Sequence, residues 1–357
     1  KKIMLKLKKL FHKCNNIPLD IFFENILYNK KDGYYVKKNP LGKNGDFITA
    51  PIISSVFSEM IAIWIVSSWT IMNKPKNFNI VELGPGNGDM CKIIIRTLKK
   101  FPKLYACTHI FMYERSEILK KIQKKTINEK KVKWIKNLDE IKKGPVIFFG
   151  NEFFDAIPVK QFKRKNNLVF ERFIKLDKKL NINQLFKEAS PKDVKELNTF
   201  STLKKTNFIE FPKLGFLELK KIISKINKLS GGILLIDYGY LGKISKSTLQ
   251  SVKSQKINKL FENIGDADVT SLVNFGLLKE YFQKKNLSVK NIVTQSFFLE
   301  RLGIHKRAEI LSQNMSFKKK ADLFLRINRL IDQKLMGELF KVIFAFKAKS
   351  KNFVGFN

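Results

Sequence analysis

Residues 80–91 read IVELGPGNGDMC, and the rest of the chain is organised around this stretch. An apolar run ends in Glu82, and Gly84, Gly86 and Gly88 follow at alternate positions before a segment with a helical pattern. Glycine permits positive φ in a tight strand-to-helix turn and leaves no Cβ where a ligand approaches the backbone. The spacing is not GxGxxG, and no Gly-Lys-Ser/Thr follows. The stretch therefore predicts a nucleotide-type loop, but neither a dinucleotide fingerprint nor a phosphate-gripping loop.

Glu-x-Gly-x-Gly-x-Gly after a strand resembles the loop of class I methyltransferases, which bind S-adenosylmethionine (SAM). The resemblance implies that Gly84, Gly86 and Gly88 hold the methionine end of SAM, with Glu82 placed to receive its ammonium directly or through water. A generic glycine-rich turn of an α/β protein is the alternative interpretation, since a short motif is a hypothesis that needs its structural context.

The composition allows a large core and favours acidic partners. The chain has 357 residues, 44% of them hydrophobic, and a net charge of +38. Such a charge favours nucleic acid, a membrane surface or an acidic protein. However, lysine is spread along the whole chain, so we interpret most of the charge as solvated surface and expect nucleic acid not to be the partner.

Cysteine and histidine spacing predicts no metal site. Cys14, Cys91 and Cys107 lack metal-type spacing, and we expect reduced thiols in a cytosol-like compartment. The best apolar run, residues 60–72, is too short to span a bilayer.

Apolar runs near residues 80, 108, 132, 146, 233, 289 and 341 alternate with helical patterns. This alternation predicts a seven-strand doubly wound α/β sheet, the class I (Rossmann-like) architecture. We expect a helical N-terminal extension over residues 1–78, with helices at 1–31, and a methyltransferase domain over 79–357. Two insertions are expected, at about 159–213 and 241–275. The first would begin as a hairpin over 159–177 and continue as an irregular segment over 178–213.

Polar side chains follow the predicted strands at their carboxyl ends, where ligands bind in parallel sheets. Glu114 ends the second strand and can accept two hydrogen bonds from a ribose diol, although a surface carboxylate at a helix start is the alternative. Asn151, Glu152 and Asp155 follow the strand at 145–150. Asp155 could equally be a structural cap.

Six motifs occurring in order resemble the MidA-like family of SAM-dependent methyltransferases, which includes a mitochondrial complex I assembly factor. They cover residues 45–51, 57–59, 82–88, 151–158, 237–239 and 265–270. The resemblance implies a protein arginine N-methyltransferase, acting on a respiratory complex I (NADH dehydrogenase) subunit or a similar protein. It places the chain in the bacterial cytoplasm, or in the mitochondrial matrix of a eukaryote. Within the Gly-Asp-Phe-x-Thr motif, Asp46 is expected to support catalysis and Thr49 to contact the cofactor.

The sequence departs from the family pattern at four places, where Ile52, Ser58, Leu272 and Asn274 stand for other residues. The last two replace a His and an Asp, which affects the substrate side more than the cofactor side. They favour one alternative, a SAM-binding assembly chaperone with little catalysis. An RNA methyltransferase is the other alternative, motivated by the charge, and it would bind RNA with strong salt dependence.

The proposed chemistry is displacement of a methyl group from a sulfonium by a guanidinium nitrogen. Positioning dominates such a reaction, and carboxylates must orient the guanidinium and stabilise its developing charge. Glu152 is the first candidate for this role, with Asp46 and Asp155 supporting it. Asn151 would orient the nucleophile's N–H.

Overall fold

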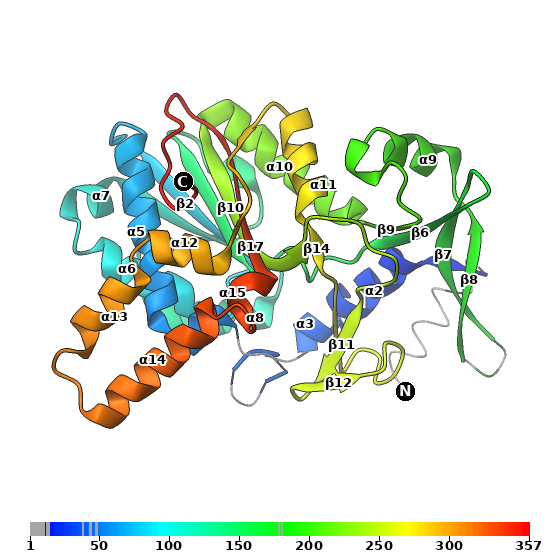
Figure 1. Cartoon of the computed structure of the whole chain (residues 1–357), viewed down its shortest axis with the longest axis horizontal. Coiled ribbons are helices and arrows are strands. Elements are labelled where there is room, and N and C mark those ends of the chain that lie inside the picture. Colours follow the sequence, from blue (N-terminus) through cyan, green and yellow to red (C-terminus); the bar gives the residue numbers. More distant parts are fainter. Residues whose placement is uncertain are drawn as a thin grey trace.

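The computed structural model describes residues 11, 15–37, 39–42, 45–46, 49–177, 179 and 181–357. A central sheet dominates the molecule (Figure 1). Its main strands are β2 (Phe78–Leu83), β3 (Thr108–Tyr113), β4 (Val132–Ile135), β5 (Val146–Asn151), β10 (Gly231–Tyr240), β15 (Ser288–Val289) and β17 (Phe340–Lys347). These are the seven strands that the sequence predicts.

The strand order is β15-β17-β10-β5-β2-β3-β4. β10, β5, β2, β3 and β4 run parallel, whereas β17 is antiparallel to both of its neighbours. The order reverses direction between β2 and β5, so the carboxyl ends of these strands open a crevice there. The doubly wound class I fold is thereby confirmed. Two short strands that the sequence did not indicate also join this sheet. β14 (Val273–Asn274) pairs with β10, and β16 (Val293–Thr294) pairs with β17.

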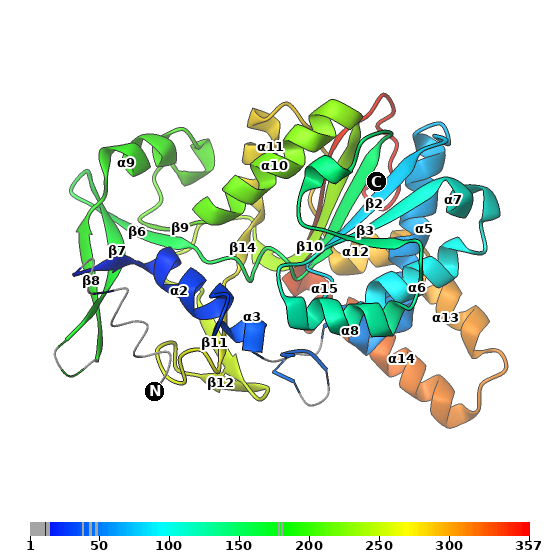
Figure 2. The ribbon, with the colours of Figure 1, turned by 180° about the vertical axis from the view of Figure 1, so that it is seen from behind.

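Helices cover both faces of this sheet (Figures 1 and 2). Successive strand residues point to opposite faces, so Ile80 packs with α5 (Ser55–Ile71) and α6 (Asp89–Leu98), while Val81 packs with α10 (Lys213–Leu229) and α11 (Phe275–Lys284). The strands are apolar on both sides for this reason. The first of these faces also carries α12 (Gln295–Arg301), α13 (Ile304–Ser312) and α14 (Phe317–Ile331).

The first insertion supplies four strands of a second sheet. Its strands are β6 (Lys160–Lys165), β7 (Leu168–Leu176), β8 (Ile182–Glu188) and β9 (Phe208–Phe211). The predicted hairpin is confirmed, with positive φ at Asn166 and Asn167 in its turn. The irregular segment expected at 178–213 is wrong, because β8, α9 (Pro191–Asn198) and β9 lie there. β8 has an exposed polar face and β9 spans only four residues, so the sequence pattern of each strand is weak.

The N-terminal part joins this insertion. β1 (Ile17–Pro18) pairs with β7, and α2 (Leu19–Tyr28) follows it. The helix expected in this region is confirmed for α2, whereas residues 1–10 and 12–14 lie outside the described residues. A third sheet, β12-β11-β13, consists of β11 (Gln250–Lys253), β12 (Lys256–Asn258) and β13 (Asp268–Thr270). The domain division at residue 79 stays a prediction.

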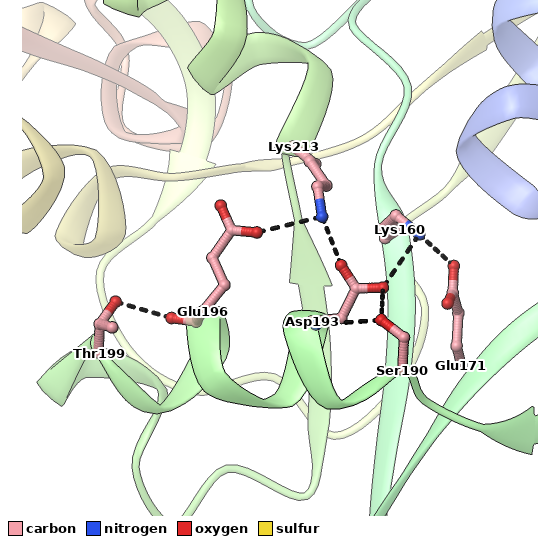
Figure 3. Close-up of polar contacts among 7 residues, drawn as sticks. All are labelled: Lys160, Glu171, Ser190, Asp193, Glu196, Thr199 and Lys213. Carbon is pink, nitrogen blue, oxygen red and sulfur yellow. Dashed lines mark hydrogen bonds and ion pairs between the residues drawn. The ribbon is translucent and has the colours of Figure 1, made fainter.

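A partly buried ion-pair network joins β6, β7 and α9 to the start of α10 (Figure 3). Lys160 of β6 pairs with Glu171 of β7 and lies 3.6 Å from Asp193 of α9. Lys213, the first residue of α10, pairs with the same Asp193 at 2.5 Å and with Glu196 at 3.1 Å. The Asp193 carboxylate is therefore shared between Lys160 of β6 and Lys213 of α10, the helix that covers the central sheet.

We expect Asp193→Ala to destabilise the protein by roughly 1–3 kcal/mol, because it leaves the buried Lys160 with one carboxylate and Lys213 with a half-exposed one. Urea unfolding measures this change. Glu188→Ala, at an exposed position of β8, is the control. An unchanged unfolding midpoint for Asp193→Ala would contradict the structural role of the network.

Candidate active site

A cavity of about 950 Å³ lies at the carboxyl ends of β2, β3, β5 and β10. Eight of the site residues predicted from the sequence line it: Thr49, Glu82, Gly84, Gly86, Glu114, Asn151, Glu152 and Asp155. Gly88 and Asp46 are not among the lining residues. The topology explains this gathering, because parallel strands bring their carboxyl ends to one edge of the sheet.

The three glycines of the turn all have positive φ, at 60° for Gly84, 55° for Gly86 and 84° for Gly88. Such values disfavour any residue with a Cβ. The Gly84 N–H donates to the carbonyl of Tyr113, which ties the turn to the end of β3. Gly88 starts α6, and a Cβ there would lie 3.1 Å from the Ile127 side chain. Gly88 thus serves the close packing of the turn, whereas Gly84 and Gly86 border the cavity.

Glu82 is a carboxyl group with little contact to water. It is 2% exposed, and its Oε2 has no hydrogen-bond partner within the described part of the chain. Burial raises the pKa of Glu82 well above its usual range, and the nearby Asp89 and Glu114 add to this. A ligand ammonium would satisfy the orphaned oxygen and favour the ionised carboxylate.

Glu114 is held by two donors from its own surroundings. Its Oε1 accepts from the Ser116 N–H at 2.7 Å, and its Oε2 accepts from Gln123 Nε2 at 3.1 Å. Burial raises the pKa of Glu114, and these two hydrogen bonds oppose the rise. Each oxygen of a carboxylate has about two acceptor sites, so both oxygens keep capacity for a ribose diol.

Glu152 occupies a strained backbone position, with φ of 50° directly after β5. Its N–H donates to the Ile236 carbonyl at 2.9 Å, and its Oε1 accepts from Asn151 Nδ2 at 3.1 Å and from the Ala50 N–H at 3.4 Å. Strain of this kind persists only where surrounding contacts fix it, and it concentrates at functional sites. Burial, reinforced by Asp155, raises the pKa of Glu152 to about 8.

Asp155 and Asp237 are two further buried carboxyl groups near Glu152. Asp237 lies in β10 directly after the part that pairs with β5. It accepts from the N–H groups of Phe154 and Asp155 at 2.9 and 3.2 Å, and so fixes the loop after Glu152. Burial raises the pKa of Asp155 to about 6 and that of Asp237 well above its usual range. The sequence singled out the motif at 237–239 but assigned Asp237 no role. Its place at a strand end was the available signal.

Asp268 and Tyr35 are cavity residues that the sequence reasoning missed. The Tyr35 hydroxyl lies 2.9 and 2.8 Å from the two oxygens of Asp268, and its ring stacks on Tyr28 at 5.1 Å between centroids. Burial raises the pKa of Asp268 to about 7. Asp268 belongs to β13 of the third sheet, and only the motif at 265–270 marked it in the sequence.

Asp46 and Thr49 come from the loop before α4 (Ala50–Ile53). Asp46 accepts from the Tyr34 hydroxyl and from the Ser254 N–H, each at 2.5 Å, so it joins this loop to the turn between β11 and β12. Thr49 lines the cavity directly before Ala50, whose N–H reaches Glu152. Residues 47–48 lie outside the described residues.

The cavity is acidic although the chain is strongly basic. Its acidic lining residues are Glu24, Glu82, Asp89, Glu114, Glu117, Glu152, Asp155, Glu218 and Asp268. Its basic ones are fewer: Lys30, Arg115, Lys120, Lys136 and Lys221. Glu82 Oε2, Asn151 Oδ1 and Asp155 Oδ1 are buried and unpartnered as far as the described residues go. An excess of carboxyl groups and hydrogen-bond acceptors fits a cationic cofactor and a cationic substrate group.

Neither a metal site nor a membrane-spanning helix occurs in the described ranges. Within them, no group of three or more His, Cys, Asp or Glu side chains is arranged to hold a metal ion. The helices in those ranges include none with the length and apolar character needed to cross a membrane.

The pKa of Glu152 gives a test on the ligand-free protein. A carboxyl whose pKa is about 8 when folded binds a proton that the unfolded chain releases near its ordinary value of 4.5, so the native state loses stability as pH rises between these values. We expect Glu152→Gln to be more stable than the parent at pH 8–9, with the advantage shrinking toward pH 5. Thermal unfolding across this pH range measures it. An advantage that does not depend on pH would contradict the burial argument.

Comparison with known proteins agrees with the geometry. A family model described as "Putative S-adenosyl-L-methionine-dependent methyltransferase" matches residues 60–293. The mitochondrial protein arginine methyltransferase NDUFAF7 of Xenopus laevis is 26% identical over 91% of this chain and 80% of its own length. The mouse protein of the same name is 28% identical over 94% and 82%.

A solved structure shares the fold over the whole length. A Burkholderia thailandensis protein determined bound to S-adenosyl-homocysteine has a TM-score of 0.83, covers 100% of this chain and 92% of its own, and is 19% identical. At this identity, the similarity shows that the two chains share a fold.

Proposed function

Since the chain belongs to the family of SAM-dependent methyltransferases whose model matches residues 60–293, we propose that it methylates an arginine side chain of a protein. The relatives that carry the name protein arginine methyltransferase support this acceptor. The carrying observation is the acidic cavity in a chain of net charge +38, because an excess of carboxyl groups favours cationic ligands. A guanidinium is a permanent cation and matches planar carboxylates.

The two sides of the cavity divide the work. Gly84, Gly86, Glu82 and Glu114 would hold SAM, which supplies an electrophilic methyl group on its sulfonium. Glu152 and Asp155 would hold the acceptor guanidinium, and Asn151 would accept an N–H through its unpartnered Oδ1. We place Asp46 outside direct contact with the acceptor and assign it to holding the loop that carries Thr49.

The raised pKa of Glu152 suits a proton acceptor. The transfer forms one N–C bond and breaks one C–S bond, and the acceptor nitrogen gives up one proton. In the ligand-free protein Glu152 is largely protonated at neutral pH, since its pKa is about 8. Two cationic ligands favour its ionised form, so the carboxylate exists when the reaction needs it. Its basicity then allows it to receive the proton.

The two alternatives are weaker on the observations. The departures at Leu272 and Asn274 do not remove a cavity residue, because neither lines the cavity and Asn274 caps α11 through Leu277 N–H. Leu272 and Asn274 therefore give no support to an assembly chaperone without catalysis. An RNA acceptor would bring phosphates to an acidic lining, which opposes binding.

The acceptor protein and the compartment are finer proposals. We propose a complex I subunit or a similar protein as the acceptor, on the sequence resemblance alone. The relatives are mitochondrial by name. For this chain we keep both a bacterial cytoplasm and a mitochondrial matrix as proposals.

We expect Glu152→Gln to bind SAM within a few fold of the parent and to lose methyl transfer by about 100-fold or more, because the neutral amide cannot accept the proton. Mass spectrometry of arginine-containing peptides incubated with SAM measures the transfer, and matched lysine peptides test the acceptor class. Glu188→Gln, on an exposed strand, is the control. Full activity of Glu152→Gln would remove the proposed role.

We expect Gly86→Val to abolish SAM binding, because a β-branched residue disfavours a φ of 55° and its Cβ would lie 2.6 Å from the Leu41 side chain. Isothermal titration calorimetry with SAM measures this. Gly242→Val is the matched control, since nothing lies within 4 Å of a Cβ built there. Retained binding by Gly86→Val would place SAM elsewhere.

A further inference from the structure

The fully buried amide of Gln123 lies beneath the cofactor side of the cavity. It belongs to α8 (Glu117–Ile127), whose inward face carries Leu119, Gln123 and Ile127. Helical spacing of this kind ordinarily places an apolar residue at the middle position, since a buried amide is costly unless its polar atoms are paired. The contacts of Gln123 therefore have to account for its presence.

Three hydrogen bonds join Gln123 to three different elements. Its Nε2 donates to the Gly86 carbonyl at 2.8 Å and to Glu114 Oε2 at 3.1 Å, and its Oε1 accepts from Trp134 Nε1 at 2.9 Å. The indole N–H is a donor only, so it determines which end of the amide faces it. A flipped amide would set its oxygen against two acceptors and its nitrogen against the indole donor. Trp134 thus orients Gln123 for both of its other contacts.

These contacts connect the two halves of the cofactor side. Gly86 belongs to the turn proposed for the methionine end of SAM, and Glu114 is the carboxylate proposed for the ribose. Both line the cavity, whereas Gln123 and Trp134 do not. One amide group outside the cavity lining therefore bonds both the turn at Gly86 and the Glu114 carboxylate.

We propose that Gln123, oriented by Trp134, is a positioning residue that holds Gly86 and Glu114 in the arrangement that binds SAM. The inference rests on the proposed roles of Gly86 and Glu114 in SAM binding. It adds a requirement that the lining residues alone do not contain, because SAM affinity then depends on two side chains that do not touch the cavity.

Charge gives the inference a distinctive signature. Burial raises the pKa of Glu114, and the hydrogen bond from Gln123 opposes the rise. Lys120 of α8 and the N–H groups of Ser116 and Arg115 also favour the ionised form, and Glu82 of β2 is the acidic neighbour. Removing the Gln123 donor raises the pKa of Glu114 further. SAM affinity should then fall at a higher pH than in the parent as the solution is acidified.

The experiment is calorimetric titration of SAM into the full chain from pH 6 to pH 9, for the parent, Gln123→Leu and Gln123→Glu. We expect Gln123→Leu to bind about tenfold more weakly at neutral pH, with the loss growing as pH falls. Gln123→Glu should show the opposite trend. Its neutral carboxyl donates one hydrogen bond, but the ionised form faces Glu114 and the Gly86 carbonyl, so its loss grows as pH rises.

Two further variants separate positioning from packing. Gln295→Leu makes the same change at another fully buried glutamine, which bonds the Leu330 carbonyl away from the cavity, and it should leave SAM affinity unchanged. Trp134→Phe should weaken SAM binding less than Gln123→Leu, and the double variant should match Gln123→Leu alone. If Gln123→Leu does not fold, judged by thermal unfolding, Gln123→Glu and Trp134→Phe carry the test.

Parent-like SAM affinity in the Gln123 variants, or losses that do not change with pH, would overturn the inference and leave the proposed function intact. A parent protein that fails to bind SAM would overturn the proposed function, and this inference with it. Opposite pH trends in Gln123→Leu and Gln123→Glu, with Gln295→Leu unaffected, would support the positioning role.

Discussion

Carboxyl groups withdrawn from water at one edge of the central sheet are the constraint on which the site depends. Glu82, Asp155, Asp237 and Asp268 are buried at or near this edge and Glu152 is half-buried there, and loss of contact with water raises the pKa of each. Acidic side chains in such a place cost folding free energy in the ligand-free protein. The apolar side chains that pack on both faces of the sheet supply the stability that offsets this cost. Cationic ligands would then recover part of it on binding.

Fixed backbone around these groups keeps the arrangement. Glu152 has a left-handed conformation and donates its N–H to the Ile236 carbonyl. Asp237 accepts from the N–H groups of Phe154 and Asp155 in the loop that follows. β5 and β10 pair in parallel register up to Asn151 and Ile236, so Glu152 and Asp237 follow at matching positions of the two chain segments. The same pairing that builds the core therefore places the side chains of the site.

The central fold and part of the site could be predicted from the sequence because both depend on local patterns. Apolar runs marked the seven strands, and a strand end marked Glu114 and Glu152. Tyr35 and Asp268 were missed because their contact joins segments 233 positions apart, and no local pattern encodes such a contact. Asp46 was selected by resemblance alone, and the structure shows it bonded to Tyr34 and Ser254 away from the cavity lining. In 178–213, β8 was missed because its face is polar and exposed, and β9 was missed because it spans only four residues.

The pairing of β1 with β7 has a consequence for how the chain acquires its shape. Ile17 lies opposite Ile174, so the strand that pairs with this segment is synthesised more than 150 positions after it. At synthesis rates of roughly 5–20 residues per second, the partner emerges about 8–30 s afterwards. During that interval the nascent Ile17–Tyr28 segment holds apolar side chains with no sheet to cover them. Completion of the smaller sheet is thus a late, non-local event, and the period of synthesis before it is the window in which chaperones would have a substrate.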